Sequence, residues 1–177
     1  MKRIVSLAAA VLIAIAACSQ DQNVYEHGYL VKVGEISPDF TIREAGGESY
    51  SLSDLRGKVV MLQFTASWCS VCRKEMPFIE DEIWLPGKDK GLAVIGIDRD
   101  EPESIVLKFS DDMKITYPLA LDPGAAIFGL FAQKEAGVTR NVIINREGEI
   151  IFLTRLFERQ EFDEMKIVIF AELSKKQ

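Results

Sequence analysis

The stretch that decides the fold runs from Val59 to Cys72 and reads Val-Val-Met-Leu-Gln-Phe-Thr-Ala-Ser-Trp-Cys-Ser-Val-Cys. Its first half, Val59–Thr65, is almost continuously apolar, which is typical of a central strand buried on both faces. Its second half places Cys69 and Cys72 three residues apart, directly before a helical pattern. One helical turn brings two such residues onto one face, with Cα atoms about 5–6 Å apart, within the range of a disulfide. We therefore predict a disulfide that can open and close.

Cys69 is predicted to stand where this helix begins. Unpaired backbone N–H groups and the positive end of the helix dipole favour an anion at that position. The thiolate is the reactive form of cysteine, and such sites lower its pKa from ~8.5 toward ~3.5–7.5. The placement of the pair therefore favours redox catalysis over a purely structural bridge.

The N-terminal segment predicts export. Lys2 and Arg3 precede an unbroken small and apolar run, Ile4–Ala17, which is too short for a confident membrane span and is typical of a secretory signal peptide. Cys18 follows a pair of small residues, a pattern that resembles the bacterial lipobox, whose cysteine is lipidated and becomes the new N-terminus. Ser19 then implies sorting to the outer membrane. The alternatives are an ordinary signal peptide or an uncleaved anchor, with Cys18 incidental.

These features divide the chain into a signal peptide (1–17), a lipidated N-terminus with a polar tether (18–32) and a folded domain (33–177). We expect a protein of the cell envelope that faces the periplasm and is held on a membrane by its N-terminal lipid.

Composition limits the function. The chain has 177 residues, of which 48% are hydrophobic, enough for one globular domain with a real core. A formal net charge of −6 argues against nucleic-acid binding. With Cys18 assigned to lipid, the three cysteines leave only the CxxC pair, so none remains for a structural framework. A zinc site would need two more ligands, and the only histidine, His27, lies far away in the N-terminal tail. We expect no metal and no cofactor.

The rest of the chain alternates strand and helix patterns. Strands are predicted at 41–43, 49–52, 59–65, 92–98, within 115–121, at 138–145 and at 150–155. Helices are predicted at 73–84 with a kink at Pro77, and at 101–112, 125–135 and 162–175. Such alternation predicts a layered α/β domain with a central mixed sheet. The CxxC then follows the carboxyl end of a central strand, the usual place for a site in such a sheet.

On these residues the chain resembles the thioredoxin superfamily, and more closely the membrane-tethered TlpA/ResA-type thiol–disulfide oxidoreductases. The resemblance covers roughly residues 33–173. It is firmest over residues 52–60 and 64–77, where the CxxC follows a tryptophan and a proline stands in the helix after it. It implies a thioredoxin-like three-layer sandwich, with helices on both faces of the sheet.

The resemblance also implies roles for individual residues. Cys69 becomes the attacking nucleophile and Cys72 the resolving thiol, which breaks the mixed disulfide. Trp68 would shape and cover the site, or simply pack. Glu75 matches an acidic residue that holds or accepts a proton as Cys72 reacts, unless it is only a solvated helix residue. Gln63 replaces the buried aspartate of many thioredoxins, so any proton relay rests on Glu75 or water.

The loop expected to face the CxxC departs from the family pattern. Thr139 stands where the family usually has a cis-proline, and a cis bond before a non-proline residue costs ~2.5–4 kcal/mol. We therefore expect a trans peptide there. We also expect the next residue, Arg140, to lie near the thiols, where a guanidinium would favour the thiolate.

The leading interpretation is an exported reductase of protein disulfides that takes electrons from a membrane thiol carrier. The first alternative is a peroxiredoxin-like thiol peroxidase with antioxidant activity, favoured by Thr139. It is disfavoured because Thr65 stands four residues before Cys69 with no proline preceding it. The second alternative is a redox-inert binding module with the same fold.

Overall fold

The structure is a computed structural model that describes residues 24–175; the predicted signal peptide and Cys18 lie outside them. The strands are β1 (Thr41–Arg43), β2 (Ser49–Ser51), β3 (Val59–Thr65), β4 (Leu92–Arg99), β5 (Leu119–Asp122), β6 (Arg140–Ile144) and β7 (Ile150–Arg155). The helices are α1 (Ser70–Ile79), α2 (Leu85–Gly87), α3 (Glu103–Met113), α4 (Phe128–Phe131) and α5 (Arg159–Ser174). Within residues 24–175, no helix is both long and apolar enough to cross a membrane.

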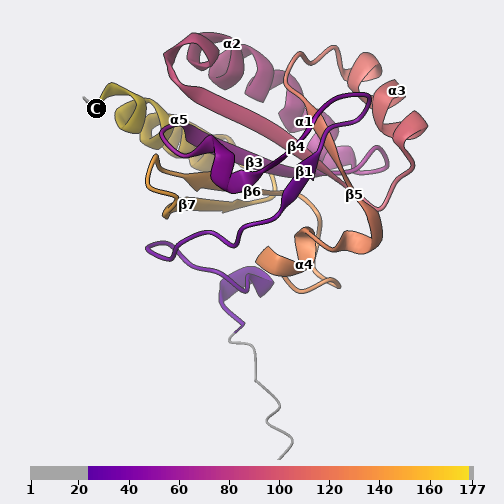
Figure 1. Cartoon of the computed structure of the whole chain (residues 1–177), viewed down its shortest axis with the longest axis horizontal. Coiled ribbons are helices and arrows are strands. Elements are labelled where there is room, and N and C mark those ends of the chain that lie inside the picture. Colours follow the sequence, from indigo (N-terminus) through magenta and orange to yellow (C-terminus); the bar gives the residue numbers. More distant parts are fainter. Residues whose placement is uncertain (1–23, 176–177) are drawn as a thin grey trace, which may run out of the picture.

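A five-stranded mixed sheet forms the centre of the molecule, in the order β5-β4-β3-β6-β7 (Figure 1). β3 lies in the middle, parallel to β4 and antiparallel to β6, and all of its residues are buried, as its apolar sequence predicted. β1 and β2 pair as a separate hairpin across the Gly46-Gly47 turn. The carboxyl end of β3 leads directly into the cysteine pair at the start of α1, which confirms the predicted position.

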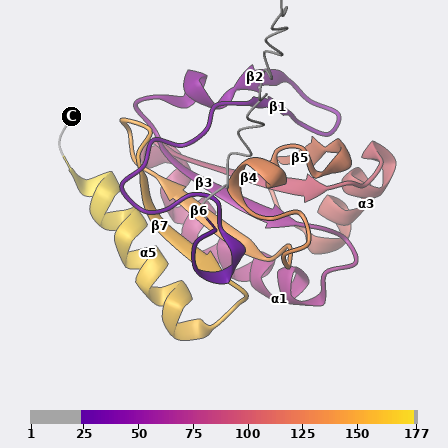
Figure 2. The same cartoon turned by 90° about the horizontal axis from the view of Figure 1, so that it is seen from below.

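The sheet carries a layer on each face, as the predicted three-layer sandwich requires. Side chains alternate along a strand, so Met61 of β3 faces one core and Leu62 the other. The first core is closed by α1, α3 and α5, and α5 lies alongside β7 (Figure 2). The second core is closed by α4, the β1–β2 hairpin and the chain that precedes it.

The helix predicted at 125–135 is wrong in length, because α4 spans only Phe128–Phe131. Ala132 is extended and forms a β-bridge with Tyr29, and the Gln133 N–H donates to the Gly28 carbonyl. These backbone groups therefore pair with the N-terminal segment instead of continuing a helix. The same contacts extend the folded part before the predicted boundary at 33, since Tyr29 and Val31 are buried in the core.

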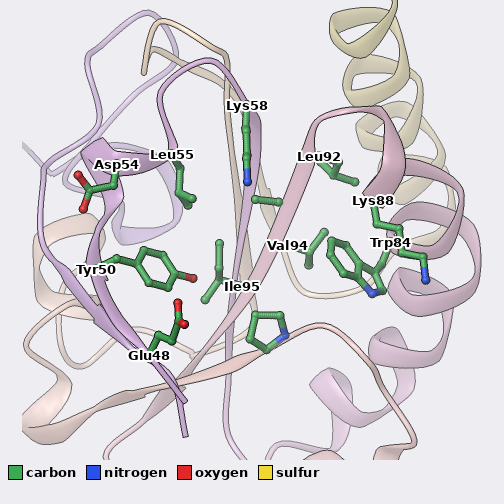
Figure 3. Close-up of a pocket in the computed structure, with 12 residues that line it drawn as sticks. Glu48, Tyr50, Asp54, Leu55, Lys58, Trp84, Lys88, Leu92, Val94 and Ile95 are labelled. Carbon is green, nitrogen blue, oxygen red and sulfur yellow. The ribbon is translucent and has the colours of Figure 1, made fainter.

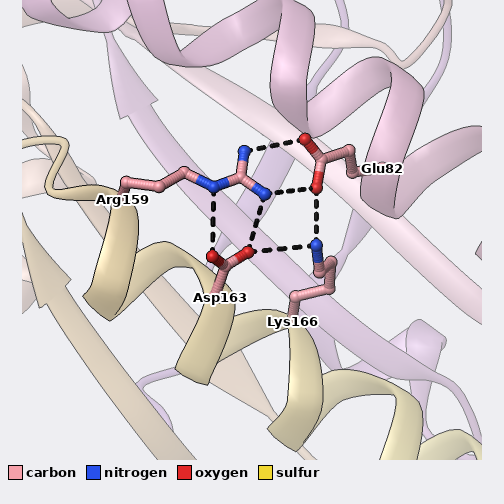
Figure 4. Close-up of polar contacts among 4 residues, drawn as sticks. All are labelled: Glu82, Arg159, Asp163 and Lys166. Atoms are coloured by element: carbon pink, nitrogen blue, oxygen red, sulfur yellow. Dashed lines mark hydrogen bonds and ion pairs between the residues drawn. The ribbon is translucent and has the colours of Figure 1, made fainter.

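The helix after the cysteines is longer than α1 alone. Pro77 lies inside α1 and has no N–H to donate, and a π-helical turn, Glu80–Trp84, follows. An ion-pair network joins this turn to α5, which begins three residues earlier than predicted (Figure 4). Glu82 accepts from Arg159 at 2.7 Å and from Lys166 at 2.5 Å. These side chains are partly exposed, so the network fixes geometry more than it adds stability.

Candidate active site

Cys69 and Cys72 form a disulfide at the start of α1, with Cα atoms 5.3 Å apart. Cys69 is the N-cap residue, and the Cys72 backbone N–H donates to its sulfur at 3.2 Å. That N–H is one of the unpaired donors of a helix N-terminus, so it can stabilise a thiolate on Cys69 once the disulfide is reduced. The disulfide predicted from the spacing is therefore present, at the predicted helix start.

The two sulfurs differ in access. Cys72 is fully buried, whereas Cys69 keeps 8% of its surface exposed at the rim of the site. Trp68 is 65% exposed beside it, an unusual exposure for so large an apolar side chain. A partner molecule can therefore approach Cys69 next to an indole ring, while Cys72 can be reached only from within the protein.

Thr139 faces the cysteines, as predicted for this loop. Its Oγ1 lies 3.2 Å from the Cys69 sulfur and 3.3 Å from the Cys72 sulfur. All described peptide bonds are trans, including the one before Thr139. The hydroxyl can donate a hydrogen bond to whichever sulfur carries negative charge, a contact that a proline at this position could not make.

Arg140 is the next residue, and within residues 24–175 no hydrogen bond joins its guanidinium to either cysteine sulfur. Its guanidinium donates to the Gly137 and His27 carbonyls at 3.0 and 2.6 Å, and it stacks on the Tyr29 ring at 4.5 Å. Alternation along β6 turns Arg140 toward the core that holds Tyr29 and both cysteines, and Asn141 toward the other face, so the proximity of the guanidinium to the thiols stays a prediction. Arg140 therefore anchors the N-terminal segment.

Glu75 lies one helical turn after Cys72 and is only 1% exposed, which rules out the solvated alternative. The Asn141 amide donates to one of its oxygens at 2.6 Å and also to the Thr154 hydroxyl at 2.9 Å. The Gln63 amide lies 3.4 Å from the other oxygen of Glu75. Within residues 24–175, no cation forms an ion pair with this carboxyl group.

Burial without a cation raises the pKa of Glu75 to about 7, and the hydrogen bonds from Asn141 and Gln63 oppose the rise only in part. The Gln63 amide is oriented by Tyr117, whose hydroxyl donates to it at 2.8 Å. At neutral pH, Glu75 can therefore either hold or accept a proton one turn from Cys72.

Sequence reasoning missed Asn141 and Tyr117. Asn141 pairs with Gln63 across β3 and β6, so the two polar residues meet in the centre of an otherwise apolar sheet. An asparagine within an apolar strand is the signal that could have pointed to it, because a buried amide needs partners.

Apart from the cysteine site, a hollow of about 440 Å³ lies between the β1–β2 hairpin and the π-helical turn (Figure 3). Tyr50 and Trp84 stand on its two sides, with Lys58 between them. Lys58 directly precedes β3, whereas the cysteines follow β3. This groove therefore lies at the opposite end of the strand from the cysteines. In the described part of the chain, no cluster of side chains could hold a metal ion.

Comparisons with known proteins agree with this geometry. Residues 33–153 match the AhpC/TSA family. The ResA thiol–disulfide oxidoreductase of Oceanobacillus iheyensis is 33% identical over 148 residues, which cover 81% of this chain and 73% of that protein. This chain therefore belongs to the AhpC/TSA family, among its ResA-like thiol–disulfide oxidoreductases. ResA of Bacillus cereus is 31% identical over 121 residues, 68% of each chain.

Solved structures of similar proteins support the same fold. A protein from Bacteroides thetaiotaomicron, assigned as a protein disulfide isomerase, is 58% identical with a TM-score of 0.81, over 84% of this chain and 94% of that one. A protein from Chlorobium tepidum, assigned as the thiol:disulfide interchange protein DsbE, is 26% identical with a TM-score of 0.71, over 81% and 99% of the two chains. The thioredoxin-like fold and the oxidoreductase activity predicted from the sequence are thereby confirmed.

Proposed function

We propose that this ResA-like oxidoreductase is exported, is anchored to a membrane through lipidated Cys18, and reduces disulfides in other proteins. The observation that carries the catalytic part is the asymmetry of the pair. Cys69 is accessible at a helix N-terminus, while Cys72 is buried one turn from a carboxyl group with a pKa of about 7. This arrangement suits attack by the first thiol and proton-coupled release by the second.

The proposed reaction starts from the dithiol form. The Cys69 thiolate attacks one sulfur of a substrate disulfide, and the other substrate sulfur leaves as a thiolate that takes a proton from water. Cys72 then passes its proton to the Glu75 carboxylate and attacks the Cys69 sulfur. The second substrate sulfur leaves as a thiolate that takes a proton from water, and two electrons have moved from the enzyme to the substrate. A membrane dithiol carrier restores the Cys69–Cys72 dithiol by the reverse exchange.

The direction of the reaction is tested by the equilibrium reduction potential of the Cys69–Cys72 pair in a defined glutathione or dithiothreitol buffer. We expect a value near or below the ~−270 mV of thioredoxin, because a reductase must give up electrons readily. A value near ~−120 mV, typical of an oxidant that donates disulfides, would contradict the proposal.

The anchor is tested separately by Cys18→Ser. In a bacterial host we expect the natural chain to fractionate with membranes and the variant to fail to acquire lipid, because the lipobox cysteine carries the acyl chains. Lipidation is read from the mass of the mature N-terminus. A natural chain without acyl mass at its N-terminus, together with equal membrane association for both chains, would refute a lipid anchor at Cys18 without affecting the redox proposal.

A further inference from the structure

The turn that presents Cys69 is held by a carboxyl group from another strand. Ser67 lies two residues before Cys69, and both its backbone N–H and its hydroxyl donate to Glu101, at 2.5 and 2.6 Å. Glu101 follows β4, so it reaches this turn from the neighbouring strand's carboxyl end. Because each oxygen of Glu101 accepts one bond from the same residue, the position of this carboxylate fixes the position of the turn.

Asp98 precedes Glu101 by three residues, and the charge of the Glu101 carboxyl group acts on it. It is the second-last residue of β4, pairs with Thr65 of β3, and is fully buried. Neither of its oxygens accepts a hydrogen bond within residues 24–175. Such a group is costly to bury unless something neutralises it. Burial first, and the facing Glu101 carboxylate second, raise the pKa of Asp98 to about 8.

The charged side chains around this pair are engaged elsewhere. The Asp122 carboxylate on β5 adds to the repulsion but accepts the Ile127 and Phe128 N–H groups at 2.7 and 2.9 Å. Two nearby arginines donate to carbonyls: Arg73 on α1 to that of Ser67, and Arg99 on β4 to those of Ala136 and Lys134. Two further carboxylates accept backbone N–H groups: Asp100 after β4 from Gly124, and Glu103 on α3 from Gly46. Among these groups Glu101 acts most strongly on Asp98, by its charge and by a hydrogen bond between the two carboxyl groups.

We propose that Asp98 is a positioning residue for thiol–disulfide exchange: it holds a proton that it donates to Glu101, and thereby fixes the Ser67–Trp68 turn in front of Cys69. The proton satisfies the buried Asp98, and each oxygen of Glu101 keeps a lone pair that accepts from Ser67. This role rests on Cys69 being the exposed, reacting sulfur, but not on the direction of the reaction. Asp98 acts through Glu101 and touches no reacting atom.

The arrangement predicts a pH-dependent turn. Below about pH 8 Asp98 holds its proton. Above it the proton leaves, and two adjacent carboxylates with no cation between them repel each other. Glu101 then shifts from Asp98, and the Ser67 contacts that orient Trp68 and Cys69 weaken.

The test compares Asp98→Asn with Asp98→Ala in the full-length reduced protein, by the rate of iodoacetamide alkylation of Cys69 between pH 5.5 and 9.5. An asparagine amide donates to Glu101 at every pH, whereas alanine never does. The natural protein should show a second inflection near pH 8, besides that of the Cys69 thiol. Asp98→Asn should match the natural rate at pH 6 and lack this inflection. The alkylation rate of Cys69 in Asp98→Ala should differ from the natural rate already at pH 6, by about threefold to tenfold, the scale of one hydrogen bond.

Trp68 fluorescence gives a second readout in a Trp84→Phe background, which leaves one tryptophan in the chain. The emission wavelength of Trp68 should shift near pH 8 when residue 98 is aspartate, and should stay constant when it is asparagine. Asp111→Asn, on the exposed side of α3, is the matched control and should keep the natural profile. An inflection that persists in Asp98→Asn would overturn the proposal. Since alkylation reports the free thiolate, it stays decisive even if the protein proves to be an oxidant or Asp98→Ala fails to fold.

Discussion

Cys72→Ser should trap this oxidoreductase on its substrate and lower turnover by on the order of 10³-fold or more, the scale on which losing a reacting group acts. Cys69 is the sulfur that a partner can reach, so the first exchange still takes place. The buried serine hydroxyl cannot then attack the mixed disulfide, because it is a far weaker nucleophile than a thiol. Trapped partners should appear as bands that dithiothreitol removes on non-reducing gels of a periplasmic extract.

The matched control is Cys69→Ser, which keeps Cys72 but removes the accessible sulfur. It should lose turnover to the same extent and form no mixed disulfides, since Cys72 is fully buried. Trapping through Cys72 instead would reverse the assigned roles. A thiol peroxidase would behave differently, because Cys72→Ser would still consume hydrogen peroxide when an external thiol is supplied. A redox-inert binding module would trap nothing and would bind partners equally well with either cysteine changed.

The sequence was most informative where one local pattern sufficed. The apolar run of β3 predicts a central strand because only a strand covered on both faces can bury every residue, and all of Val59–Thr65 are buried. The spacing of Cys69 and Cys72 predicts their pairing because one helical turn fixes the distance between them. Neither inference depends on distant parts of the chain.

The features that sequence reasoning missed depend on distant partners. The length of α4 is set by Tyr29, which forms a bridge with Ala132 more than a hundred residues later in the chain. The partners of Arg140 are likewise distant, because its guanidinium bonds to the His27 carbonyl and stacks on the Tyr29 ring. No local pattern in a single sequence shows these partners, whereas Thr139 was placed correctly from its position in the loop that faces the cysteines.

Buried polar residues are the other class that local patterns could not resolve. Glu75 could be read as solvated or buried, because helix periodicity does not show what covers a given face. Its burial follows from the packing of α1 on the sheet, which brings Asn141 and Gln63 to its carboxyl group. These contacts decide whether Glu75 can exchange a proton near pH 7, and that property can be measured independently of catalysis.

Glu75→Gln should remove a pH dependence from the stability of the oxidised protein. The pKa of Glu75 is about 7 in the folded state and near its usual 4.5 when unfolded. Between these values the folded chain binds more protons than the unfolded one, so the free energy of unfolding falls as pH rises through this window. A shift of this size corresponds to roughly 3 kcal/mol of stability, which is fully present below pH 4.5 and is lost by the time the pH exceeds about 7.

Urea denaturation at pH 4.5, 6 and 7.5 measures this difference. Glutamine disturbs the hydrogen bonds of Asn141 and Gln63 by an amount that does not depend on pH, so the variant should gain about 3 kcal/mol relative to the natural protein between the lowest and highest pH. Glu147→Gln, which changes an exposed carboxyl group, should show no such gain. Parallel curves for Glu75→Gln and the natural protein would mean that Glu75 titrates normally. The carboxyl group would then be fully ionised at neutral pH and too weak a base to take the proton of Cys72, and the proton-coupled release proposed for this site would fail.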